Sequence, residues 1–218
     1  MADKRSSPIQ EIATELSASD VAEHFQPYAI ELGAFVYGWN QLHDNLADLF
    51  WSVVGGVDGS VPLAIWHALT SDRTQRQVLA AAAKARFRAK FVKRELRHNY
   101  KETAERIEWL LEETNKLANR RNMVIHSPYW FLKGEKKLVP NAFFGSPLAR
   151  GLEKHDLLQE FRWCREAATV LSGFASRLAV ALRIEAEQPP WPDIPKLPNR
   201  GHKSIPRPHR PASQPPKK

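Results

Sequence analysis

The feature that most constrains this chain is a set of apolar stripes with helical spacing. The first stripe has alternating spacings of three and four positions: Leu32, Phe35, Trp39, Leu42, Leu46, Leu49 and Val53. Such spacing places all its members on one face of an α-helix. A second stripe follows the same rule from about 155 to 183: Leu157 or Leu158, Phe161, Cys164, Ala168, Leu171, Phe174, Leu178 and Leu182. These faces favour an all-α bundle of four or five helices.

Three more helices are predicted between the two stripes. A short one runs from Val61 or Pro62 to Leu69, and the next begins after the N-cap candidates Ser71 and Asp72. The third runs from about 99 to 126 and must end there, because Pro128 disfavours helical geometry in the residue before it. Residues 129–132 and 137–139 flank a glycine and predict a small hairpin insertion.

Proline and charge divide the 218 residues into three parts: a flexible N-terminus (1–17), a helical domain (18–187) and a disordered tail (188–218). The tail holds 10 of the 16 prolines and +6 of the net charge of +8. A segment of this composition cannot build a core, and its deletion is expected to leave the fold intact. Three roles for the tail stay open: binding an anionic surface, docking into a groove of a partner protein, and solubilising the chain.

Several classes of protein are excluded by composition. The single cysteine, Cys164, permits neither an internal disulfide nor a cysteine-based zinc cluster, and it lies on an apolar stripe. No apolar run approaches the ~18 residues of a membrane span, and the N-terminal residues lack the apolar stretch of a signal peptide. We therefore expect a cytoplasmic protein. No phosphate-loop motif and no metal-ligand spacing is found, so we expect no cofactor or metal.

The segment NKLANRRNMVIHSPYWF, residues 115–131, carries the clearest candidate site. Arg121 offers a planar, permanently charged fork for a phosphate, and His126 titrates near neutrality at a helix end, which suits proton transfer. Asn122 would orient one of them or contact the substrate, and Arg120 is a rival for the arginine role. Five residues at ~100° each place His126 about 140° around the helix from Arg121. Convergence therefore needs a frayed helix end or a second subunit.

This pattern resembles the HEPN superfamily, in which an arginine, four to six residues and a histidine end a helix, often with a polar residue after the arginine. The resemblance extends over residues 30–135 to a group of bacterial HEPN-like proteins without an assigned function. It implies a four- or five-helix bundle that forms a homodimer and cleaves or binds RNA without a metal. Arg121, Asn122 and His126 would be catalytic, and the setting would be a toxin–antitoxin or antiphage system.

Other residues are candidates for RNA contact. A basic run from Arg73 to Arg97 is either a solvated helix face or a surface for an RNA backbone. The candidates for RNA binding are Arg76, Arg86, Arg88, Arg120 and Tyr129. His43 and Asp44 are interpreted as solvated side chains, with a place at the border of the implied cleft as the alternative.

The competing hypothesis is a non-catalytic helical interaction module. Arg121 would then cap carbonyls or pair with Glu112 or Glu113, and His126 would cap the helix end over Trp130. This hypothesis predicts that Arg121 and His126 are buried and satisfy each other. The enzyme hypothesis instead needs both side chains exposed in a cleft.

Overall fold

The computed structural model describes residues 17–56, 58–87, 97–132, 135–142, 145–184 and 191–200. It confirms the all-α class, with a single two-stranded hairpin in the described part of the chain. The helices and strands are α1 (Ala18–Asp20), a π-helical turn (Val21–Phe25), α2 (Gln26–Val54), α3 (Ser60–Ala68), α4 (Asp72–Arg86), α5 (Arg97–His126), β1 (Tyr129–Leu132), β2 (Lys137–Pro140), α6 (Pro147–Arg150) and α7 (Leu157–Arg183).

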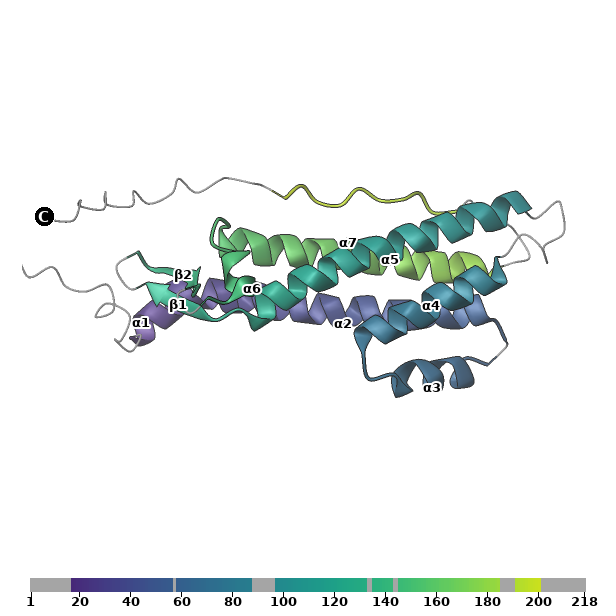
Figure 1. Ribbon diagram of the computed structural model, residues 1–218, viewed down its shortest axis with the longest axis horizontal. Coiled ribbons are helices and arrows are strands. Elements are labelled where there is room, and N and C mark those ends of the chain that lie inside the picture. Colours follow the sequence, from purple (N-terminus) through teal and green to yellow (C-terminus); the bar gives the residue numbers. More distant parts are fainter. Residues whose placement is uncertain are drawn as a thin grey trace, which may run out of the picture.

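The long helices α2, α5 and α7 run along the long axis of the molecule (Figure 1). The most extensive helix packing is between α2 and α7, which carry the two predicted stripes. Every stripe member from Phe35 to Val53 and from Phe161 to Leu182 is buried in one core. Burial of these apolar faces is the main force that holds the bundle together.

Helices α3 and α4 pack on α2, and α4 also contacts α5. Helix α2 stops at Gly55, whose φ of +83° is a conformation that glycine adopts without strain. Helix α4 begins after Ser71, whose side chain accepts a hydrogen bond from the backbone N–H of Thr74. This turn brings the first residues of α4 beside the middle of α2, where the site described below lies.

The predicted hairpin follows α5. Tyr129 pairs with Pro140 and Leu132 with Lys137 in an antiparallel register. Helix α5 ends at His126, and the backbone N–H of Ser127 still bonds the carbonyl of Met123 at 3.2 Å. The short helix α6, capped by Ser146, was not expected from the sequence.

Residues 191–200 differ from the prediction of a disordered tail. They form an extended segment beside α5 and α7 (Figure 1), and Trp191 and Leu197 pack against the core. Arg106 Nε donates to the carbonyl of Pro192 at 3.1 Å, and Trp163 Nε1 donates to that of Pro198 at 3.0 Å. The prolines do prevent a helix, but the apolar residues between them anchor the segment. The rest of the predicted tail, 185–190 and 201–218, and the N-terminal residues 1–16 lie outside the described residues.

Candidate functional site

The predicted motif lies on the last turns of α5, and its members have different surroundings. Arg121 is half-buried, whereas Asn122 and His126 are exposed. Arg121 Nη1 donates to Asn122 Oδ1 at 3.3 Å. His126 is not among the described residues that line the cavity entered by Arg121. The structure therefore brings Arg121 and Asn122 together and leaves His126 apart, as the helical geometry predicts for a single subunit.

Arg121 lines a cavity of about 220 Å³ between α2, α3, α4 and α5. The cavity is lined by Trp39, Asn40, His43, Asp44, Trp66, His67, Asp72, Gln75 and Arg121. The Nε atom of Arg121 is buried and has no hydrogen-bond partner in the part of the chain that the structure describes. A buried donor without a partner is costly, so this guanidinium is suited to an incoming acceptor.

His43 is the functional candidate that sequence reasoning ranked too low: the solvated interpretation was favoured over a place at the border of the cleft. Its side chain is only 12% exposed and its ring lies against that of Trp39, with centroids 4.8 Å apart. Its Nδ1 lies 3.1 Å from Gln75 Oε1, and its Nε2 lies 3.4 Å from Arg76 Nη1. Because Arg76 donates to it, Nε2 carries the lone pair. The available signal was the spacing of four between Trp39 and His43 on the buried face of a predicted helix.

His43 is neutral near pH 7. Burial lowers the pKa of His43, and the charges of Arg76 and Arg121 lower it further. The carboxylate of Asp72 and the hydrogen bond to Gln75 oppose this effect without overcoming it. The 3.9 Å approach of His43 Nε2 to Asp72 is therefore not an ion pair at neutral pH. Asp72 instead accepts a hydrogen bond from Trp39 Nε1 at 3.2 Å.

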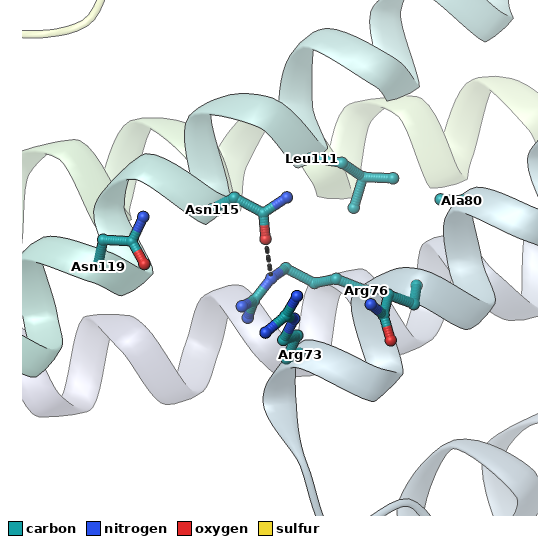
Figure 2. Close-up of a pocket in the computed structure, with 7 residues that line it drawn as sticks. Arg73, Arg76, Ala80, Leu111, Asn115 and Asn119 are labelled. Atoms are coloured by element: carbon teal, nitrogen blue, oxygen red, sulfur yellow. Dashed lines mark hydrogen bonds between the residues drawn. The ribbon is translucent and has the colours of Figure 1, made fainter.

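Arg76 was predicted to lie on a polar face that could contact RNA, but it is buried. Its Nε donates to Asn115 Oδ1 at 2.8 Å (Figure 2). Its guanidinium carbon lies 5.8 Å from the ring centroid of Trp39. Burial lowers the pKa of Arg76, but an arginine stays charged in proteins. Arg76 therefore brings a buried positive charge to the junction of α2, α4 and α5.

Arg120, the rival for the arginine role, is a structural residue. It is buried and forms an ion pair with Glu160 of α7, whose side chain is 3% exposed. Glu160 also accepts a hydrogen bond from Arg200 at 2.9 Å. Burial alone would raise the pKa of Glu160, but the two arginines outweigh it and hold that pKa below its usual value. With its guanidinium committed to Glu160, Arg120 is not available to an RNA.

The remaining RNA-contact candidates also have structural partners or lie outside the description. The Tyr129 hydroxyl donates to the carbonyl of Val124, and burial raises the pKa of Tyr129. Arg86 Nη1 donates to the carbonyls of Ser52 at 2.6 Å and Val53 at 2.8 Å, at the end of α2. Arg88 lies outside the described residues.

The partners proposed for Arg121 in the non-catalytic hypothesis are occupied elsewhere. Glu112 and Glu113 both pair with Lys116, at 2.8 and 2.7 Å. Cys164 is buried in the core, and burial raises the pKa of its thiol, which makes it a poor nucleophile. Within the described residues, no cluster of three or more histidine, cysteine or acidic side chains is arranged to hold a metal ion.

Comparison with known proteins finds no relative of this chain. The chain matches no protein-family model, no curated protein and no solved structure. The resemblance to HEPN proteins therefore stays a prediction that rests on the motif. None of the described helices is both long and apolar enough to cross a membrane.

Proposed function

We propose that the protein binds RNA at the Arg121 cavity and cleaves it without a metal ion. The observation that carries this proposal is that Arg121 and the neutral His43, which are far apart in the sequence, line one cavity. A guanidinium that binds the phosphate and a neutral imidazole that accepts a proton are the two groups that transesterification of RNA requires. The chemistry needs no cofactor.

In this mechanism, a ribose 2′-hydroxyl replaces the Arg76 guanidinium as the hydrogen-bond donor to His43 Nε2, and Nε2 then removes the proton of that hydroxyl. The 2′-oxygen attacks the adjacent phosphorus, and the bond to the 5′-oxygen breaks. The protonated imidazole then returns a proton to the leaving 5′-oxygen, which gives a 2′,3′-cyclic phosphate and a 5′-hydroxyl. Arg121 stabilises the charge that develops on the phosphate oxygens. Asn122, bonded to Arg121, positions its guanidinium.

His126 keeps the acid–base role implied by the resemblance only if it reaches the phosphate from a second subunit. The proposal therefore includes a cytoplasmic homodimer, as the HEPN resemblance implies. A toxin–antitoxin or antiphage setting belongs to the same expectation.

The experiment is cleavage of a mixed single-stranded RNA pool in EDTA, with the 3′ ends of the products analysed. We expect cyclic phosphate ends, and a rate loss of about 10²–10³ for Arg121→Gln and of about 10²–10⁴ for His43→Gln. Arg177→Gln, an exposed position on α7, is the control for lost charge. An inert wild type, or full activity of Arg121→Gln, would overturn the proposal.

A non-catalytic interaction module remains the second candidate, favoured by the buried pair of Arg120 and Glu160. That pair commits one arginine of the motif to a contact with α7. The exposure of His126 opposes the detailed form of this hypothesis, which needs Arg121 and His126 to be buried and to satisfy each other. Wild-type protein that binds RNA or a protein partner without cleaving RNA in the assay above would favour it.

A further inference from the structure

A second cavity, of about 420 Å³, lies on the other side of Arg76, between α4 and α5. It is lined by Arg73, Arg76, Gln77, Ala80, Leu111, Asn115 and Asn119. Figure 2 shows the two arginines of α4 facing the two asparagines of α5. Its volume is within the range of roughly 300–1,000 Å³ that is typical of small-molecule sites.

The charges around this cavity are unbalanced. Arg73 lies close enough to Arg76 for its charge to lower the pKa of Arg76, and none of the described residues that line the cavity is acidic. Asp72, the acid nearest along the chain, raises the pKa of Arg76 more than Arg73 lowers it, but it accepts a hydrogen bond from Trp39 and is not among the lining residues. Two neighbouring guanidinium groups without an acid between them favour an anion, which would relieve their repulsion.

The polar groups fit a tetrahedral oxyanion. The Nε atom of Arg76 is held by Asn115, which fixes the direction of the buried guanidinium. Arg73, Gln77 and Asn119 are exposed, so their side chains can adjust to a ligand. We infer that this cavity is a phosphate-binding site, occupied by the phosphate of a nucleotide or of a nucleic-acid backbone. Arginine supplies bidentate bonds to phosphate oxygens, and the amides supply further donors.

Arg76 forms the boundary between the two cavities, because it contacts His43 of one and Asn115 of the other. An RNA strand that binds in both cavities must pass Arg76. This extension to RNA rests on the proposed function, whereas the phosphate site itself does not.

The test compares wild type, Arg73→Gln and the control Arg177→Gln. The probes are inorganic phosphate, adenosine monophosphate and a short single-stranded RNA, each titrated by calorimetry. We expect Arg73→Gln to lower the affinity for the probe that occupies the cavity about tenfold, or about 1.4 kcal/mol. Arg177→Gln should leave that affinity unchanged. If Arg73→Gln lowers the affinity for the two small probes, the natural ligand is a free phosphate compound. If it lowers the affinity for RNA alone, and reduces by about 0.7 the slope of log affinity against log salt concentration, the ligand is a backbone phosphate.

Side-chain NMR of the arginine Nε resonances locates the bound phosphate, and the resonances of Arg73 and Arg76 should shift together. The inference is overturned if Arg73→Gln binds all three probes as wild type does, or if Arg177→Gln loses as much affinity. Arg121→Gln separates the two proposals. If it abolishes cleavage but retains phosphate binding, both stand. If wild type binds phosphate here but never cleaves RNA, only the proposed function fails.

Discussion

The side-chain amide of Gln75 fixes which nitrogen of His43 carries a proton. Gln75 Nε2 donates to the carbonyls of Trp66 at 3.1 Å and Leu69 at 3.3 Å, so its Oε1 faces His43 Nδ1. Nδ1 must therefore carry the hydrogen, and the lone pair is on Nε2. The end of α3 and the start of α4 thus set the tautomer of a histidine on α2.

The lowered pKa of His43 makes stability depend on pH. Below the ordinary histidine pKa of 6.5, the unfolded chain binds a proton at His43 that the folded chain does not. The free energy of unfolding should therefore fall as pH falls from about 6.5 toward the pKa of the folded state. Urea unfolding at several pH values measures this. The difference between wild type and His43→Gln isolates the contribution of His43, and a difference that does not change with pH would contradict the assignment.

A carboxylate in place of the Gln75 amide should raise the pKa of His43. An opposite charge at hydrogen-bond distance favours the imidazolium, so Gln75→Glu should raise this pKa by on the order of one unit or more. NMR titration of the imidazole resonances measures it. Gln77→Glu adds the same charge at an exposed position of the same helix and should have a smaller effect. Equal shifts in the two variants would show that the contact is not specific.

Arg120 and Arg121 should differ sharply in their effect on stability. Arg120→Ala removes the partner of the buried Glu160 on α5; breaking such a pair costs up to roughly 3–5 kcal/mol, and the remaining partner Arg200 lowers this cost. Arg121→Ala removes a half-buried side chain from a cavity and should cost less than about 1 kcal/mol. Chemical denaturation of both variants tests this contrast. A larger loss for Arg121→Ala would reverse the roles assigned to the two residues.

A chain that ends at residue 190 should be less stable than a chain that ends at Arg200. The shorter chain loses the packing of Trp191 and Leu197 and the hydrogen bond from Arg200 to Glu160. We expect a loss of roughly 2 kcal/mol or more in the free energy of unfolding. The chain ending at Arg200 keeps these contacts and serves as the control. Equal stability of the two chains would restore the expectation that the whole tail can be removed without effect.

Arg86 should stabilise the end of α2. Arg86→Ala removes the donor that satisfies the carbonyls of Ser52 and Val53, which lack partners within the helix. The expected cost is about 1–3 kcal/mol, as for other bonds to charged groups. Lys84→Ala, at an exposed position of the same helix, should cost little. Thermal unfolding of both variants distinguishes a helix cap from a solvated basic side chain.

The sequence predicted the long helices well, because apolar spacing reports burial directly. Phe35 and Phe161 are fully buried on the expected faces, and Gly55 ends α2 as expected. The sequence was less informative where a polar residue is buried against a partner that is far away in the chain. Nothing local distinguishes Arg120 from Arg121, and only the position of Glu160 on α7 does so.

The burial of His43 and of residues 191–200 also depends on partners that are far away in the sequence. His43 was predicted to be solvated, but α4 covers it and supplies the hydrogen-bond partner Gln75. The proline-rich composition of the tail predicted disorder, whereas residues 191–200 form an extended segment that packs against the helices. Their packing depends on Arg106 and Trp163. These partners belong to other parts of the chain and leave no periodic signal in the tail.

The adjacency of Arg120 and Arg121 has an evolutionary consequence. Successive residues of a helix point about 100° apart, so one guanidinium reaches α7 and the other reaches the cavity against α2. In related sequences, a change at Arg120 should be accompanied by a change at Glu160, because residues in contact co-vary. Arg121 should instead be retained or lost together with His43. Two neighbouring residues of one motif are therefore expected to evolve under independent selection: Arg120 for folding and Arg121 for ligand binding.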